Sequence, residues 1–160
     1  MSDIHNDTRL TSTEREAVQG VVDRALRASQ NDDRTGIAAA IVCGEWILEI
    51  AENEVNTFGD PTKHAEMVVI AAVTEKLDRK ELSDCTLISS LQPCEMCLSA
   101  MRFAGIKRVI YCAQQANVAG KYFVFPDLKI EDFERAGEAF EYIGGVSEKE
   151  VIHLYAAGDE

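Results

Sequence analysis

The feature that most restricts how this chain of 160 residues can fold is a pair of short, chemically reactive motifs. The first is His64–Glu66, which reads HAE, and the second is Pro93–Cys97, which reads PCEMC. Imidazole and thiolate groups are the ligands that zinc prefers, and ligands of one ion must converge on a single point. If the two motifs bind one ion, the fold must bring residue 64 beside residues 94 and 97.

The candidate ligands number three, which favours a site that carries out chemistry. A structural zinc site is usually closed by four ligands, whereas three protein ligands leave a position for water. Zinc lowers the pKa of that water to roughly 7, so hydroxide becomes available at neutral pH. Cys85 and Cys112 remain alternatives as a fourth ligand, although both lie in strand-like apolar runs where a thiol packs as a small hydrophobe.

Glu66 has the chemistry of a proton carrier. It lies two residues after His64, near the start of the same predicted helix, so its carboxylate can reach the water position without binding the metal. There it can act first as a general base and then as a general acid. Both motifs fall where we predict helix N-termini, which lower thiol pKa values and stabilise the thiolates that zinc requires.

Apolar patterns predict strands that alternate with helices. A capping box at Thr13–Glu16 predicts the start of a first helix, and two strand-like runs on either side of Gly44-Glu45 predict a β-hairpin. The other elements expected are a loop over 53–63, helices over 64–77 and 94–104, strands over 85–90 and 107–112, a loop over 113–127, a helical turn over 131–135, a strand over 140–144, and a last helix from a second capping box at Ser147–Glu150 to about residue 157. This order predicts an α/β class with a central sheet covered by helices on both faces.

The charge balance disfavours nucleic acid as a partner. Lys and Arg total 16 against 28 Asp and Glu, a net charge of −12. From residue 131 onward there are nine acidic residues against Arg135 and Lys149 alone. Neutralising phosphates supplies most of the affinity for nucleic acids, and a surface of this sign repels phosphate.

Targeting signals and disulfides are not indicated by the sequence. The first ten residues are polar, with no apolar region of a secretory signal, and the longest apolar runs are too short to span a bilayer. Five cysteines are an odd number, and a C-x-x-C spacing in a cytosolic chain indicates a metal or redox site more than a structural bridge. We therefore expect a cytoplasmic protein with no membrane segment.

The two motifs together resemble the zinc signature of the cytidine deaminase superfamily, H-x-E followed by P-C-x-x-C. The wider context, DPTKHAE at 60–66 and LQPC at 91–94, is similar to the branch of guanine deaminases, bacterial tRNA adenosine deaminases and fungal-type cytosine deaminase. The resemblance implies a three-layer α/β/α fold around a five-stranded mixed sheet. It also implies a single CMP/dCMP deaminase-type zinc-binding domain over 1–160, with its core at about 13–157.

The resemblance implies roles for individual residues in metal binding and catalysis. His64, Cys94 and Cys97 would bind Zn²⁺, and Glu66 would move the protons. The reaction implied is hydrolytic removal of an exocyclic amine as ammonia, with no organic cofactor.

The resemblance also implies contacts with the substrate. Asn53 matches the asparagine that hydrogen-bonds the base in this branch, with an ordinary turn residue as the alternative. The backbone N–H of Ala65 would contact the ring, and the carbonyl of Leu91 would lie near the departing ammonia. The loop over 118–128 supplies Tyr122, Phe123 and Phe125, which could stack on a planar base or pack in the core or a dimer contact. Asp127 could hydrogen-bond an amino or ring N–H group.

The sequence favours an amino-substituted free nucleobase or a similar heterocycle as the substrate, with a guanine deaminase-like enzyme preferred and tRNA adenosine deaminase or cytosine deaminase as alternatives. Gln92 stands where the tRNA and guanine enzymes commonly carry Glu, and the acidic C-terminal segment argues against RNA. Relatives in this branch are usually dimers, so we expect a homodimer.

Two readings from other classes remain open. One is a structural module whose zinc only stabilises the fold, in which case replacing Glu66 would remove no activity. The other is a thiol redox protein that uses Cys94 and Cys97, although the thioredoxin-like surroundings of such a pair are missing from the sequence. Neither reading explains why His64 and Glu66 stand together at the start of a preceding helix.

Overall fold

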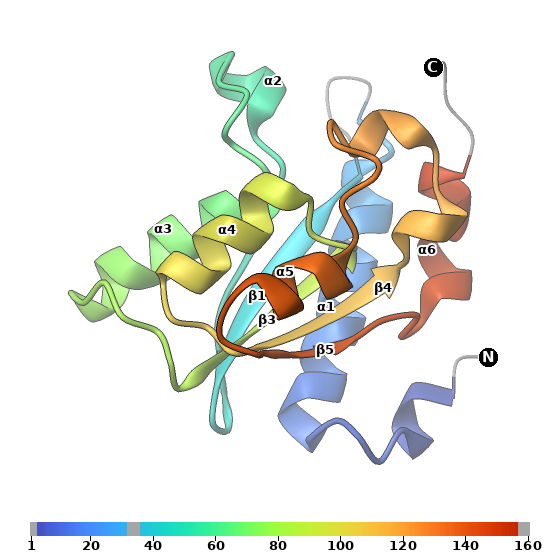
Figure 1. The fold of residues 1–160 in the computed structure, drawn as a ribbon. Helices are drawn as coiled ribbons and strands as arrows, with labels where there is room; N and C mark the ends of the chain where they lie inside the picture. Colours follow the sequence, from blue (N-terminus) through green and yellow to red (C-terminus); the bar gives the residue numbers. More distant parts are fainter. Residues whose placement is uncertain (1–2, 32–35, 157–160) are drawn as a thin grey trace.

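A mixed sheet of five strands forms the centre of the structure, a computed structural model that describes residues 3–31 and 36–156 (Figure 1). The strand order is β2-β1-β3-β4-β5, in which β1 is antiparallel to both neighbours while β3, β4 and β5 are parallel. The strands are β1 (Ala38–Cys43), β2 (Trp46–Glu52), β3 (Cys85–Leu91), β4 (Arg108–Ala113) and β5 (Glu141–Ile143). The predicted α/β class and mixed five-stranded sheet are confirmed.

Helices cover both faces of the sheet. Helices α1 and α6 pack together on one face, while α3 and α4 pack together on the other, where α5 lies beside α4 (Figure 1). The helices are α1 (Ser12–Ala28), α2 (Val55–Phe58), α3 (Ala65–Leu77), α4 (Glu95–Phe103), α5 (Ile130–Ala136) and α6 (Glu148–Tyr155), with 3-10 turns at Asp3–Asn6, Gln115–Asn117 and Gly120–Tyr122. Because helices cover both sides, β3 is buried along its whole length.

The predicted periodicities explain these elements. The apolar positions of α1 recur at helical spacing and all lie in the core, namely Ala17, Val18, Val21, Val22 and Ala25. The β1–β2 hairpin turns at Gly44, whose φ of 61° is a left-handed conformation that glycine adopts without strain. No helix within the described ranges is long and apolar enough to cross a membrane.

Both predicted capping boxes are wrong in detail. The first box exists two residues earlier: Thr11 caps α1, its hydroxyl accepts from the N–H of Glu14, and the Glu14 carboxylate accepts from the N–H of Thr11. The second does not form, because Ser147 has a φ of 54° and its side chain makes no capping hydrogen bond to α6. This helix ends at Tyr155, and residue 157 lies outside the described residues.

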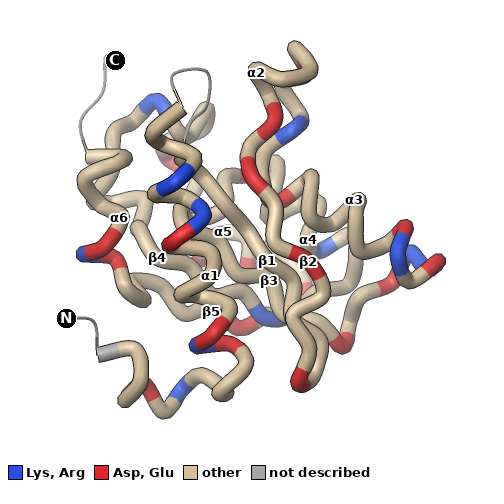
Figure 2. The backbone as a smooth tube through the Cα atoms, turned by 180° about the vertical axis from the view of Figure 1, so that it is seen from behind, with Lys and Arg blue, Asp and Glu red and all other residues tan. Residues whose placement is uncertain are grey.

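The segment expected as a loop over 53–63 contains the short helix α2, which stands out from the rest of the fold (Figures 1 and 2). It ends at Gly59 in a left-handed conformation. The chain then returns to the sheet, where α3 begins directly after residue 64. Helix α4 begins shortly after the carboxyl end of β3, so the N-termini of α3 and α4 meet at the same edge of the sheet.

Candidate active site

The first residues of α3 and α4 hold the two motifs. His64 is the N-cap residue of α3 and Cys94 is the N-cap residue of α4. Neither side chain makes the capping hydrogen bond that Ser, Thr, Asp or Asn commonly makes at this position, so both remain available as ligands. Cys97 follows in the first turn of α4 and is completely buried. The backbone N–H groups at the two helix starts favour thiolate at this point.

The three side chains converge as one ion would require. The Nδ1 atom of His64 lies 3.5 Å from the Sγ of Cys94 and 3.6 Å from the Sγ of Cys97. All three ligand atoms lie within 4.8 Å of one another. Ligands about 2.0–2.3 Å from a tetrahedral zinc stand roughly 3.3–3.8 Å apart, so the spacing and the donor set both fit zinc. Cys85 and Cys112, the alternative fourth ligands, do not belong to this group.

The electrostatics of the cluster already favour a thiolate. The thiol of Cys97 donates to Cys94 and, with a further hydrogen bond from His64, lowers the pKa of Cys94 to about 4. The same bond and burial raise the pKa of Cys97, and the negative Cys94 raises the pKa of His64. Cysteine binds metals in its thiolate form, so one ligand is prepared at neutral pH.

Glu66 lies beside the cluster with only 4% of its surface exposed. Burial is the main cause that raises its pKa to about 7, and the negative charge of Cys94 raises it further. A backbone hydrogen bond, the charge of His64 and a hydrogen bond from Ser89 oppose this shift but do not cancel it. A carboxyl group with a pKa near the working pH can both take and give a proton, as general acid–base catalysis needs.

A cavity of about 270 Å³ opens directly onto these residues. Its lining is Ile37, Asn53, Val55, Asn56, His64, Glu66, Leu91, Gln92, Cys94, Lys121, Tyr122 and Val124. Two of the predicted substrate residues, Asn53 and Leu91, are therefore brought to the metal cluster from the ends of β2 and β3. Ala65 is the first residue of α3 and is completely buried, and it is not among the lining residues.

Two other predicted substrate residues do not line the cavity. Phe123 is 7% exposed and packs against Cys94 and Cys97, where it shields the ligands. Asp127 is exposed and lies outside the lining. From the same loop, Tyr122 and Lys121 face the cavity instead. Their roles in substrate binding stay predictions.

Gln92, which the sequence distinguished only as a departure from the Glu of related enzymes, lines the cavity. It is buried, and its Oε1 accepts a hydrogen bond of 2.9 Å from the backbone N–H of Gln115. That bond fixes the orientation of the amide and leaves its NH₂ end available to the cavity. The pairing of β3 with β4 and the turn after β4 create this contact, so only the position of Gln92 next to Pro93 could have suggested it.

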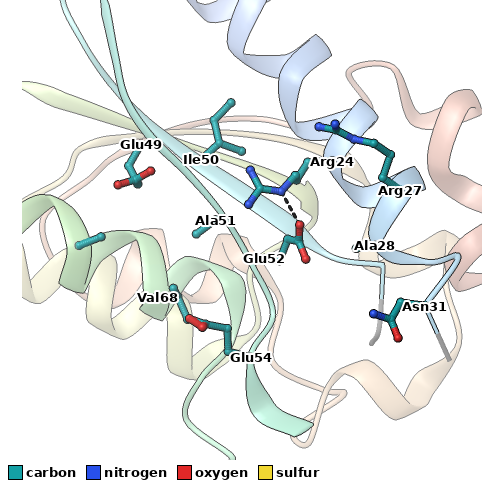
Figure 3. A pocket seen from close by; sticks show the side chains of 11 residues that line it. Arg24, Arg27, Ala28, Asn31, Glu49, Ile50, Ala51, Glu52, Glu54 and Val68 are labelled. Carbon is teal, nitrogen blue, oxygen red and sulfur yellow. Dashed lines mark hydrogen bonds and ion pairs between the residues drawn. The ribbon is translucent and has the colours of Figure 1, made fainter. Parts of the chain in front are cut away.

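A wider hollow of about 770 Å³ lies elsewhere, along β2 between α1 and α3 (Figure 3). Arg24 forms an ion pair with Glu52 across it, and Glu49, Glu54 and Arg27 also line it. None of its lining residues belongs to the His64 cluster. The smaller cavity is therefore the candidate active site, because it alone of these two combines metal ligands with a buried acid.

Comparisons with known proteins agree with this chemistry. Residues 11–113 match the family described as the cytidine and deoxycytidylate deaminase zinc-binding region. The guanine deaminase of Bacillus subtilis is 40% identical over 81 residues, 51% of this chain and 52% of that protein, so the match spans about half of the relative's length. The tRNA-specific adenosine deaminase of Aquifex aeolicus is 37% identical over 104 residues, 63% of this chain and 69% of that protein.

The solved structures are similar over more of the chain. A structure from a study of A-to-I editing by tRNA:A34 deaminases matches with a TM-score of 0.74 and 26% identity. The match covers 87% of this chain and 98% of the other. The resemblance indicated by the two motifs, the three-layer fold and zinc as the expected metal are thereby confirmed.

Proposed function

Because this chain belongs to the cytidine and deoxycytidylate deaminase family, we propose that it removes the amino group of a free purine base, such as guanine, by hydrolysis. The observation that carries the proposal is the cavity of about 270 Å³ lined by Glu66 and by His64 and Cys94, two members of the three-residue candidate metal cluster. This volume is slightly below the range for small-molecule pockets, roughly 300–1,000 Å³, and suits a single base.

His64, Cys94 and Cys97 would hold the zinc, since their spacing and chemistry fit it and Phe123 excludes water from the sulfur side. When bound, zinc supplies a Lewis acid that activates water at neutral pH. Three protein ligands mark a catalytic site more than a structural one. This count argues against the structural module, and the paired imidazole argues against a simple redox dithiol.

Glu66 would carry protons between water and the base. Its carboxylate would take one proton from the attacking water and deliver it to a ring nitrogen. It would then take the second proton from the hydroxyl on the substrate carbon and deliver it to the leaving amine. The raised pKa supports both halves of this role, because neither protonation state is strongly preferred near neutral pH. The carbonyl of Leu91, at the end of β3, would accept from the departing ammonia.

Two amide side chains and one backbone group would orient the base. Asn53 lines the cavity and uses its Oδ1 to accept from the N–H of Val55 at 3.0 Å, which leaves its NH₂ for a substrate acceptor. Gln92 also presents an NH₂ group. The N–H of Ala65, in the first turn of α3, has no partner within its own helix and can donate to the ring. A guanine-like base, with its carbonyl oxygen and ring nitrogens, offers acceptors to all three.

Charge and identity favour a free base over RNA. The chain has a net charge of −12, and Figure 2 shows Lys and Arg positions scattered among Asp and Glu positions. Anionic RNA gains affinity from clustered cations, which this distribution does not favour. The Bacillus guanine deaminase also has the higher identity of the two relatives compared above.

A tRNA adenosine deaminase is the second candidate. The match to a structure from a study of tRNA:A34 deaminases covers nearly all of that chain and supports this alternative. Lys121 at the cavity rim is a cation that could contact a phosphate. Cytosine deaminase remains a third candidate from the motif context.

Ammonia release from the zinc-loaded protein tests the proposal. The panel contains guanine, adenine, cytosine, isoguanine, their nucleosides, pterins, aminotriazines and a tRNA anticodon stem-loop. We expect release from guanine or a close purine analogue, which is lost in Glu66→Gln. Release only from the stem-loop would replace our proposal with the RNA alternative. Silence across the panel from a protein with one bound zinc would favour the structural module.

We also propose that the chain forms a homodimer through the α4–α5 face. Phe103 on α4 is 93% exposed, and Phe125 and Leu128 are exposed nearby. Apolar exposure of this extent typically marks an interface. Phe103→Ser should shift the molecular mass in light scattering from dimer to monomer. Trp46→Ser, which removes an exposed aromatic from the β1–β2 hairpin, should leave the mass unchanged.

A cytoplasmic location is proposed from the thiols. All five cysteines are free, and free thiols persist in the reducing cytosol. Cell fractionation followed by thiol labelling would test this location, and recovery in an oxidising compartment would contradict it.

A further inference from the structure

A second group of metal-binding side chains lies where β1 ends and β3 begins. It consists of Cys43, Asp84 and Cys85, whose ligand atoms lie within 4.8 Å of one another. Cys43 and Cys85 are directly paired in the antiparallel ladder between β1 and β3. Residues directly opposite each other project their side chains to the same face of a sheet, so strand pairing itself brings the two thiols together.

This group is separate from the active site. Cys85 begins β3 and Leu91, which lines the active-site cavity, ends it. Six residues at about 3.3 Å each place roughly 20 Å between the two ends of the strand. The two groups share no residue, so anything that binds at the second group does so outside the catalytic cavity.

The distances in this group match those of the zinc cluster. The Sγ of Cys43 lies 3.2 Å from the Oδ2 of Asp84, and the Sγ of Cys85 lies 3.5 Å from the Oδ1 of Asp84. These values are close to the 3.5 and 3.6 Å between His64 and its two cysteines. They also approach the roughly 3.3–3.8 Å expected between ligands of one tetrahedral zinc. Both thiols donate to one carboxylate, which is the group that would join them in binding a cation.

We propose that Cys43, Asp84 and Cys85 form a second metal site, which binds a divalent cation of the zinc class. Two thiolates select zinc, cobalt or cadmium over magnesium and calcium, which take oxygen ligands. Binding replaces the proton of each thiol by the metal and releases two protons to solvent. The three protein ligands leave the remaining position to water.

Arg79 competes for the same carboxylate. Its Nη2 lies 3.0 Å from the Oδ1 and 3.2 Å from the Oδ2 of Asp84. The Arg79 and Asp84 side chains are 39% and 53% exposed, and ion pairs this exposed contribute little to stability. A cation can therefore displace the guanidinium, and the exposed carboxylate offers it a route of entry. The competition and the exposure make this site the weaker of the two.

Metal stoichiometry tests the site. The protein of 160 residues is dialysed against micromolar zinc with a non-thiol reductant, and bound metal is counted by mass spectrometry. We expect two zinc ions per wild-type chain and one in Cys43→Ser. Asp84→Asn, which changes an exposed side chain and should preserve the fold, is expected to bind one as well. The matched control is Cys112→Ala, which removes a buried thiol that belongs to neither group and should retain two.

Cobalt binding and the variant Arg79→Gln test the second site further. In wild type, the second equivalent of Co²⁺ should add thiolate-to-cobalt absorption that Cys43→Ser lacks. Arg79→Gln removes the competitor, so it should lower the dissociation constant of the second site about two- to fivefold. One zinc per reduced wild-type chain would overturn the proposal. Two zinc ions in both Cys43→Ser and Asp84→Asn would overturn it equally.

Discussion

Two buried glutamates, one at the start of α1 and one at the start of α3, have pKa values shifted in opposite directions. Glu14 at the start of α1 is 3% exposed and Glu66 at the start of α3 is 4% exposed. Burial acts to raise the pKa of Glu14, but hydrogen bonds from Arg108 and from Thr11 outweigh it and hold the pKa below 4.5. At Glu66 burial prevails and raises the pKa, and the negative charge of Cys94 raises it further.

The difference lies in the partners that the fold supplies. Arg108 donates to both carboxylate oxygens of Glu14 at 2.8 Å, and the N–H of Thr11 adds a third bond of 2.8 Å. Glu66 faces a thiolate instead of a guanidinium. A carboxylate whose charge is fully paired stabilises a fold, whereas one whose charge is poorly compensated can exchange protons. The first joins α1 to β4, and the second is suited to catalysis.

The largest effect that would test this contrast is on activity. Glu66→Gln should lower kcat by about 10²–10⁴-fold, because the amide cannot carry a proton. Bound zinc should be unchanged, and the melting temperature should be equal or higher, because no buried charge remains. Glu75→Gln, an exposed change on the same helix, is the control and should retain full activity. Comparable activity in Glu66→Gln would remove Glu66 from the reaction.

Replacing the buried glutamate at the start of α1 should change the stability of the fold rather than the activity. Glu14→Gln leaves Arg108 without its buried partner, so the free energy of unfolding should fall by about 3 kcal/mol. Activity per folded molecule should not change. Glu141→Gln removes the exposed partner of the same arginine and should cost under about 1 kcal/mol. Denaturant unfolding measures both values, and equal losses would show that burial does not set the strength of this network.

Asn53 has a structural group and a substrate-facing group in one side chain. Its Oδ1 is hydrogen-bonded within the protein, and its NH₂ faces the cavity. Asn53→Asp keeps the acceptor for Val55 and removes the donor, so kcat/KM should fall about tenfold with little loss of stability. Asn53→Ala removes both and should lower kcat/KM and the melting temperature together. Steady-state kinetics and thermal unfolding separate the two, and unchanged kinetics in both variants would leave Asn53 a turn residue.

The smallest effect expected is the dependence of stability on acid. Since the pKa of Glu14 is depressed in the folded protein, its contribution is fully present above about pH 4.5. It is lost as the pH falls through the lower, folded-state pKa. The melting temperature of wild type should therefore fall more steeply below pH 4.5 than that of Glu14→Gln. Parallel curves for the two proteins would assign acid unfolding to other carboxyl groups.

Much of the active site was predictable because local pattern and ligand chemistry coincide there. His64 and Cys94 stand where apolar periodicity begins, so their places at helix starts follow from the sequence. Lys121 was not assigned, and Tyr122 was named only as one of three aromatics that could stack on a base. The orientation of both depends on how a loop of 3-10 turns folds over α4. Asn56 was missed for a similar reason, since α2 is one turn long and has no periodicity to detect.

The helix caps also show that contacts with distant residues decide whether a local sequence pattern forms. Thr13–Glu16 satisfies the capping pattern as well as Thr11–Glu14 does. Only the Thr11–Glu14 box forms, because Glu14 also binds Arg108, 94 residues away. Ser147 has the right residue type for a cap, but the turn after β5 places it in a left-handed conformation that prevents capping.

The sequence by itself determined the family and the chemistry to be expected of it, because residue types and spacings supply three candidate zinc ligands, a candidate proton carrier and alternating strands and helices. Only the tertiary structure decided which side chains complete the site. It also decided that two distant cysteines meet across β1 and β3, and that one buried glutamate is paired with a cation while the other is not. The physical reason is that pKa values, cavity walls and ligand distances depend on neighbours brought together by the sheet, which no local pattern specifies.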